Sequence, residues 1–180
     1  MTTDAVLGVV LDELRASFRA QKRLGDGALA QLEAADVHVR PDPGSNSIAV
    51  IVKHLHGNMM SRWTDFLSRD GEKPERRRDE EFEEHGASLA QVSGWWEEAW
   101  GVALAELDRL QVGDLARTVT VRGEPHSVPA ALLRNLTHTA QHVGQIVLLA
   151  KHVRGERWQT LSIPRGGTAA FNRDKGFEPR

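Results

Sequence analysis

The sequence contains no cysteine, and this absence excludes several kinds of chemistry. Without a thiol of its own, the chain cannot form a disulfide, use a cysteine nucleophile or bind a metal ion through thiolate sulfur. Any thiol chemistry would therefore require a thiol supplied as a substrate.

The chain also lacks a strong charge of one sign and a long apolar run. Its 180 residues include 23 Lys and Arg against 25 Asp and Glu, so no basic field favours a nucleic acid or an anionic membrane. No apolar run approaches the roughly 18 residues that a membrane span needs. Acidic side chains at Asp4, Asp12 and Glu13 stand where a signal peptide would be basic and then apolar. We expect a cytoplasmic protein with neither a nucleic-acid nor a membrane partner.

Several functional motifs are missing as well. There is no internal repeat, no glycine-rich phosphate loop and no arrangement that singles out a Ser-His-Asp triad. The segment RGGT at 165–168 is short and lacks the strand-to-helix context of a nucleotide loop. The length of 180 residues predicts one domain over 1–180, and 40% apolar with 27% charged residues is an ordinary composition for such a domain. Within it, the helical patterns described next predict a bundle over about 4–154, and the Gly-, Pro- and polar-rich remainder predicts an irregular tail over 155–180.

Apolar residues at helical spacing predict four main helices, and hence an all-α bundle. The first begins with Asp4 as N-cap, is interrupted at Gly25 and Gly27, and resumes towards Ala35. Its expected apolar face consists of Val6, Val9, Val10, Leu14 and Phe18. The other three helices are expected over 48–68, 88–110 and 128–154.

Local signals mark the ends of these helices and one short β-hairpin. Pro129 suits a first helical turn, and Gly155 suits a terminator. Residues 118–121 predict a strand that turns at 122–125 and pairs with 126–128. The hairpin therefore precedes the last helix.

Two further stretches have a simple structural interpretation. The charged segment 71–86 is typical of a long loop or a solvated face. Trp95, Trp96 and Trp100 are expected to include core anchors rather than residues that stack on a cofactor.

The most informative stretch is THTAQHVGQI at 137–146, which places His138 and His142 four residues apart in the last helix. Residues at this spacing lie on one face, so both imidazoles can reach one metal ion. Eight histidines in a chain of this length would give about 0.3 such pairs by chance, so the pair alone is weak evidence. Thr139 stands where the metalloprotease helix motif has its glutamate base, which excludes that motif.

A third ligand is available from the second helix, at His54 or His56. Their spacing of two prevents both from facing the same way, and apolar periodicity does not choose between them. If the second and fourth helices are neighbours, either His54 or His56 completes a three-histidine site with His138 and His142. Such a site has an open coordination position and suits Zn²⁺, Ni²⁺, Cu²⁺ or Fe²⁺. The alternative is that each histidine simply bonds to a backbone carbonyl.

Two segments resemble the DinB-like superfamily, a group of four-helix-bundle metalloenzymes: SIAVIVKHL at 47–55 and HTAQHVGQI at 138–146. The segments GNMMSRWTDFLSRDGEKPERRRDEEFE, VRGEPHSV and LSIPRGGTAAFN resemble an uncharacterised bacterial subfamily. The resemblance thus covers nearly the whole chain. It implies a DinB-like four-helix bundle and, by the spacing from the Ser-Ile start, selects His54 over His56. It also implies His138 and His142 as the other ligands of a divalent Zn, Ni or Fe ion.

The resemblance further implies a reaction class. Superfamily relatives include transferases that use bacillithiol or mycothiol, and a mycothiol-dependent maleylpyruvate isomerase. We therefore expect a metal-dependent transferase in which a low-molecular-weight thiol binds as thiolate and attacks an electrophile. Arg62, Arg165 and Asn172 are expected to hold a carboxylate on the substrate.

Two other functions fit the same residues. One is a metal-dependent hydrolase, for which Asp65 lies too far along the helix to be a convincing base. The other is a non-catalytic dimeric bundle with a structural metal or none. A homodimer is also common in the superfamily, and a face of the second helix was expected to offer a partner surface through Val52, Met59, Trp63 and Phe66.

Overall fold

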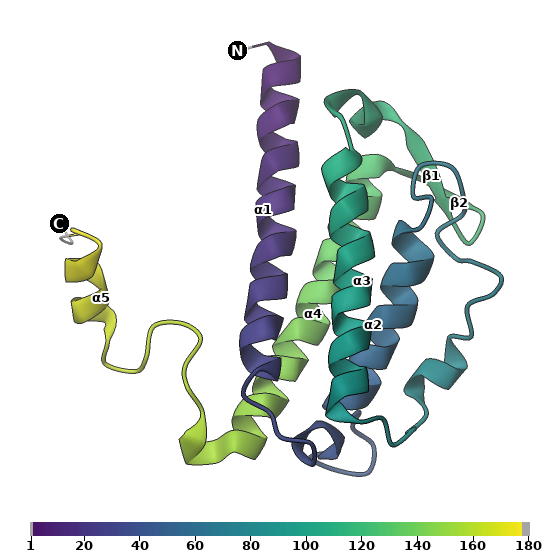
Figure 1. Ribbon diagram of the computed structural model, residues 1–180. Helices are drawn as coiled ribbons and strands as arrows, with labels where there is room; N and C mark the ends of the chain where they lie inside the picture. The colour runs from purple at the N-terminus through teal and green to yellow at the C-terminus, as the bar shows by residue number, and fades with distance from the viewer. Residues whose placement is uncertain (1, 178–180) are drawn as a thin grey trace.

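The computed structural model describes residues 2–177 and shows a four-helix bundle with a short additional helix in the tail (Figure 1). The helices are α1 (Thr3–Leu29), α2 (Ile48–Trp63), α3 (Leu89–Arg109), α4 (Val128–Arg154) and α5 (Thr168–Asp174). Helices α1 and α4 run in one direction, and α2 and α3 run in the other (Figure 1). Each of α1 and α2 packs against both α3 and α4. The predicted all-α bundle is confirmed, and α2 and α4 are antiparallel neighbours.

A small hairpin connects α3 to α4, as the sequence predicted. Strand β1 (Thr118–Val121) pairs antiparallel with β2 (Glu124–Ser127), and Val121 is opposite Glu124. The two turn residues, Arg122 and Gly123, have φ angles of 56° and 75°. Positive φ at both positions is the geometry of a tight two-residue hairpin turn, in which an arginine is unusual.

Side-chain caps explain where the four bundle helices begin, and in α4 the cap is Ser127, whose hydroxyl accepts a hydrogen bond from the Ala130 amide. The hydroxyl of Ser47 accepts a hydrogen bond from the Val50 amide and starts α2. Ser88 forms a capping box with Gln91 at the start of α3. Helix α1 is capped by Thr2, so the prediction of Asp4 as its N-cap was wrong. Asp4 lies instead in the first turn, where its negative charge interacts favourably with the helix dipole.

Helix α1 runs without a break through Gly25 and Gly27, which corrects the predicted interruption. Gly25 is needed for packing, since a Cβ atom placed there would lie 2.3 Å from two ring carbons of Trp96. The indole of Trp96 donates a hydrogen bond to Asp26 at 2.7 Å, and its ring packs against Trp100. Gly25 therefore allows the Trp96 ring of α3 to pack closely against α1.

The predicted apolar face of α1 is correct for its second half only. Leu14 and Phe18 are buried, whereas Val6, Val9 and Val10 are 48%, 52% and 44% exposed. The first turns of α1 extend past the ends of the other bundle helices, so they have little surface to pack against (Figure 1).

Two other predicted boundaries differ from the structure. Helix α2 ends at Trp63 rather than near Ser68, because Thr64 is extended and Asp65 has a φ of 52°. The tail was expected to be irregular, but it contains α5 and a 3₁₀ turn over Gly155–Arg157.

The proposed partner surface on α2 is wrong. Its apolar residues belong to the bundle core, since the following are all buried: Val52, Met59, Trp63 and Phe66. Trp96 and Trp100 are core anchors, as predicted, and Trp95 is half-buried. A homodimer stays a prediction that requires a different surface.

The charged segment 71–86 is not simply solvated. It belongs to the connection from α2 to α3, which returns along α2 and packs on it. Lys73 and Glu81 are buried, and the ammonium group of Lys73 donates to the carbonyls of Ser61 and Asp70. Its charged side chains therefore form hydrogen bonds and ion pairs inside the fold.

Among the helices of residues 2–177, none combines the length and the apolar character that a bilayer span requires.

Candidate metal centre

Three histidines meet between α2 and α4. His54 comes from α2, and His138 and His142 come from successive turns of α4. Their ring centroids lie 4.7 to 5.2 Å apart, and one nitrogen from each ring lies within 4.8 Å of the others. Three imidazoles from two antiparallel helices therefore converge on one point of the bundle.

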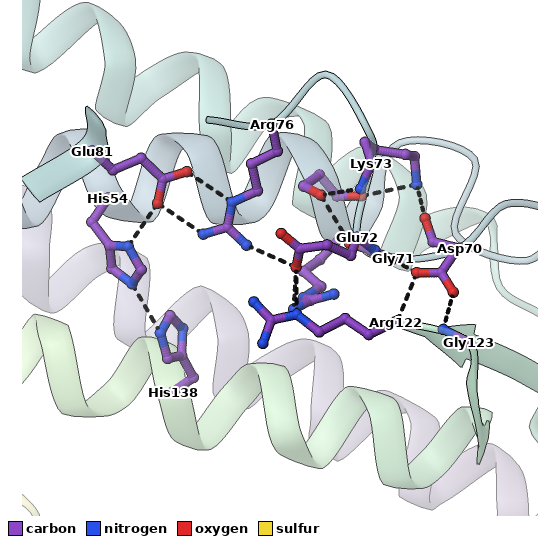
Figure 2. Close-up of polar contacts among 12 residues, drawn as sticks. His54, Asp70, Gly71, Glu72, Lys73, Arg76, Glu81, Arg122, Gly123 and His138 are labelled. Atoms are coloured by element: carbon purple, nitrogen blue, oxygen red, sulfur yellow. Dashed lines mark hydrogen bonds and ion pairs between the residues drawn. The ribbon is translucent and has the colours of Figure 1, made fainter. Parts of the chain in front are cut away.

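His54 is fixed by a carboxylate from the α2–α3 connection. Its ring is 4% exposed, and its Nδ1 lies 2.9 Å from Oε2 of Glu81 (Figure 2). Because an ionised carboxylate only accepts hydrogen bonds, Nδ1 carries the proton and Nε2 has a free lone pair. A carboxylate that orients a histidine in this way is typical of metal-binding histidines.

Glu81 is held in turn by Arg76. Two guanidinium nitrogens of Arg76 donate to the two carboxylate oxygens of Glu81, at 2.7 and 2.8 Å (Figure 2). Burial raises the pKa of Glu81, but the bonds from Arg76 and His54 outweigh this effect and lower it. Glu81 is therefore ionised at neutral pH and fixes the tautomer of His54.

The two histidines of α4 have different partners. Nδ1 of His142 lies 2.8 Å from the amide oxygen of Gln145, to which it donates, so its Nε2 is also free. Nε2 of His138 lies 3.1 Å from Nε2 of His54 (Figure 2). Within the described part of the chain, the buried Nδ1 of His138 has no hydrogen-bond partner.

Both histidines of α4 are neutral at pH 7. Burial, followed by the charges of His142, His54 and two arginines, lowers the pKa of His138 to about 4. Burial also lowers the pKa of His142. A neutral imidazole is the form that binds a metal ion, so this environment favours ligation over protonation.

The donor set suits a transition-metal ion. Metal–nitrogen bonds of about 2.0–2.1 Å in tetrahedral geometry place two ligand nitrogens about 3.3 Å apart. The Nε2 atoms of His54 and His138 are 3.1 Å apart. Three neutral nitrogens leave a coordination position for a ligand from outside, which distinguishes such sites from closed structural ones.

The cluster opens into a pocket of about 350 Å³. Its walls are basic and carry no carboxylate among the described residues. Besides the three histidines, the lining consists of Asn58, Arg62, Arg76, Arg78, Phe82, Arg122, Arg134 and Asn135. A second pocket, of about 410 Å³, lies on the other side of Arg76 and Glu81 and is lined by none of the three histidines.

The other predicted residues lie in different places. His56 faces α3, where its Nε2 is 2.9 Å from a carboxylate oxygen of Glu98, so it does not join the cluster. Arg62 lines the histidine pocket. Arg165 and Asn172 belong to the tail, Asn172 within α5, and neither lines this pocket. The structure thus brings Arg62, but not the tail residues, to the histidines.

The sequence did not reveal Glu81 or Arg76 as parts of this site. They lie in the segment interpreted as a solvated loop, and neither has a local pattern that points to His54. Gly57 is the one trace of their position, since a Cβ atom there would lie 2.2 Å from Oε1 of Glu81. A glycine in the middle of α2 therefore marks where the connection approaches this helix.

Replacing Glu81 by glutamine should weaken metal binding about 10- to 100-fold, because the amide orients His54 less firmly and lacks the negative charge. The dissociation constant can be measured by competition with a chromophoric chelator. Glu80→Gln is the matched control, since Glu80 is exposed and pairs with Arg77 at the surface. Equal affinities in the two variants would contradict a role for Glu81 at the metal.

The fold and the cluster together define a four-helix-bundle protein with a histidine group suited to a metal ion. Residues 8–167 match a family described as "Protein of unknown function (DUF1572)", and the chain belongs to that family. A search of curated proteins found no match.

Proposed function

We propose that this chain is a DinB-like metalloprotein that holds one divalent transition-metal ion at His54, His138 and His142. The observation that carries the proposal is the convergence of three imidazole nitrogens, within 4.8 Å of one another, at the floor of an open pocket. The pairing of His54 with Glu81 supports it, because that bond leaves Nε2 of His54 available. Zn, Ni and Fe all suit three neutral imidazoles.

We further propose that the site activates a low-molecular-weight thiol for transfer to an electrophile. When bound, such an ion supplies Lewis acidity that lowers the pKa of an incoming thiol. The chain has no thiol of its own, so the nucleophile comes from a substrate. In the transfer, the thiol proton passes to solvent and the sulfur forms a bond to the electrophilic carbon. In a substitution the electron pair of the broken bond departs with the leaving group, and in an addition the π pair moves to the neighbouring atom, which takes a proton from solvent.

The lining of the pocket supports transfer over hydrolysis. Metal-assisted hydrolysis is accelerated by a general base near the attacking water. The nearby Glu81 is occupied by Arg76 and His54, and the described lining of the pocket contains no carboxylate. Asp65, considered as a base from the sequence, lies beyond the end of α2 with an exposed side chain. A thiolate needs no such base once its proton has been lost.

Thiol binding should stabilise the metal-loaded protein. At a thiol concentration of 100 times the dissociation constant, the gain is about 2.7 kcal/mol, or a rise of about 5 to 10 °C in melting temperature for a chain of this size. The measurement is a thermal-shift series with N-acetylcysteine and cysteinyl-glucosamine on the zinc- and nickel-loaded forms.

Two controls make this result specific. The S-methyl derivative of each thiol retains its size but cannot form a thiolate, so it should give no shift. The metal-free protein should not respond to the thiols either. If no thiol, or the S-methyl form equally, shifts the melting temperature, thiol activation is rejected while metal binding is judged separately.

A further inference from the structure

Arginine side chains from four parts of the chain surround the histidine cluster. Arg62 comes from α2, Arg76 and Arg78 from the α2–α3 connection, Arg122 from the hairpin turn and Arg134 from α4. Figure 2 shows Arg76 and Arg122 approaching Glu72 from opposite elements, close to His54 and His138. Residues far apart in the sequence thus make one basic wall.

The carboxylates near this wall do not balance its charge. A single oxygen of Glu72 contacts Arg62 at 2.9 Å, Arg76 at 3.3 Å and Arg122 at 3.4 Å. Glu81 pairs with Arg76 as well. Among residues 2–177, Arg134 has no carboxylate within 4.0 Å. Arg78 pairs with Asp79 at 3.8 Å. Two carboxylates, Glu72 and Glu81, therefore face the other four guanidinium groups of the wall, which has a net positive charge.

One of these arginines is buried and incompletely satisfied. Arg62 is 7% exposed, and its Nη1 has no hydrogen-bond partner in the described chain. Burial and the charges of Arg76, Arg122 and Arg134 lower its pKa, whereas Glu72 opposes that effect. A buried guanidinium donor without a partner costs free energy, which an added acceptor would recover.

Arg122 is held at this wall by an unusual backbone. Its φ of 56° is a conformation that glycine or asparagine adopts more readily. The carboxylate of Asp70 accepts hydrogen bonds from the amides of Arg122 and Gly123, both at 2.8 Å, and from Glu72 at 2.7 Å (Figure 2). Asp70 thus joins the hairpin turn to the segment that carries Glu72. An arginine kept where a smaller residue would be less strained indicates a use for its side chain.

We propose that the part of this wall formed by Arg62, Arg122 and Arg134, beside the histidines, is a subsite for an oxyanion of the substrate. A carboxylate or a phosphate group would lie against the guanidinium groups, while the reacting end of the same molecule reaches the histidine cluster. Only the statement that the reacting end reaches the histidine cluster rests on the proposed function. Binding of the oxyanion by the arginines requires no metal. The pocket of about 350 Å³ suits a small organic acid or phosphate ester.

The test uses succinate and inorganic phosphate as probes, titrated into the full-length metal-free protein by calorimetry at fixed ionic strength. Both Arg122→Gln and Arg134→Gln remove an exposed guanidinium, so the fold is expected to tolerate them. Each should weaken binding of the better probe at least about tenfold, the loss of one charge-assisted hydrogen bond. Arg77→Gln is the matched control. Arg77 is also an exposed arginine, but it lies in the α2–α3 connection and lines the second pocket instead of the histidine pocket.

The outcomes separate this proposal from the metal site. Retained anion binding in a His138→Ala His142→Ala variant supports the subsite even if no metal binds to the wild type. A tighter fit for succinate identifies a carboxylate substrate, and a tighter fit for phosphate identifies a phosphate ester. The proposal is overturned if neither probe binds at millimolar concentration, if uncharged succinamide binds as tightly as succinate, or if Arg134→Gln and Arg77→Gln bind equally well.

Discussion

Replacing His138 and His142 together by alanine is expected to remove the metal ion from the purified protein. The change takes away two of the three imidazoles that converge between α2 and α4 and leaves His54 as a single ligand. One imidazole does not retain a divalent ion through purification, so the metal content should fall from about one ion per chain to near zero. Elemental analysis by mass spectrometry, on protein without a histidine tag, gives the content directly.

His56→Ala is the matched control for this experiment. It removes a histidine from the same helix as His54, but His56 faces α3 and pairs with Glu98. Its metal content should equal that of the wild type, whereas His54→Ala should bind metal more weakly. The site would be rejected if the double variant and the wild type contained equal metal, and the choice of third ligand would be rejected if His56→Ala lost the ion.

Gly25→Ala should destabilise the fold by up to about 2 kcal/mol net, because overpacking a core costs about 1 to 3 kcal/mol and the gain in helix propensity is about 1 kcal/mol. The added Cβ atom would lie 2.3 Å from ring carbons of Trp96, which cannot move freely because its indole is bonded to Asp26 and packed against Trp100. The gain in helix propensity therefore offsets only part of the packing cost. Urea unfolding followed by tryptophan fluorescence measures the difference.

Gly8→Ala provides the opposite expectation in the same helix. The nearest atom to a Cβ atom at Gly8 is a methyl group of Val112 at 3.9 Å, an ordinary contact. This variant should therefore gain up to about 1 kcal/mol from helix propensity. If both variants shifted stability in the same direction by similar amounts, close packing of Trp96 on α1 would not be the reason for Gly25.

Features that depend on neighbouring residues were predictable from the sequence. The spacing of His138 and His142 placed both on one face of α4, and Pro129 and Gly155 marked the ends of that helix. The turn predicted over 122–125 indicated the hairpin, although the structure confines the turn to Arg122 and Gly123 and begins the second strand at Glu124. These signals are local, because helix faces, caps and tight turns are determined by residues a few positions apart.

Features that depend on distant contacts were not predictable in this way. Gly25 was interpreted as a helix breaker because its reason, Trp96, is far along the chain. Glu81 and Arg76 appeared to be ordinary surface charges, since their burial arises only when the connection packs on α2. The choice of His54 over His56 required the family resemblance, because a helix with apolar residues on most sides gives no preferred direction.

The parallel course of α2 and α3 has a consequence for how this protein can diversify. Since α3 begins beside the start of α2, the chain must travel back along the full helix, about 24 Å, before α3 can form. That return is what brings Arg76 to the pocket, and Glu72 and Glu81 to the side chains that line it, without using core positions of the four helices. A substitution at an exposed position of this connection, such as Arg78, can therefore change the wall of the pocket while the four helices keep their packing.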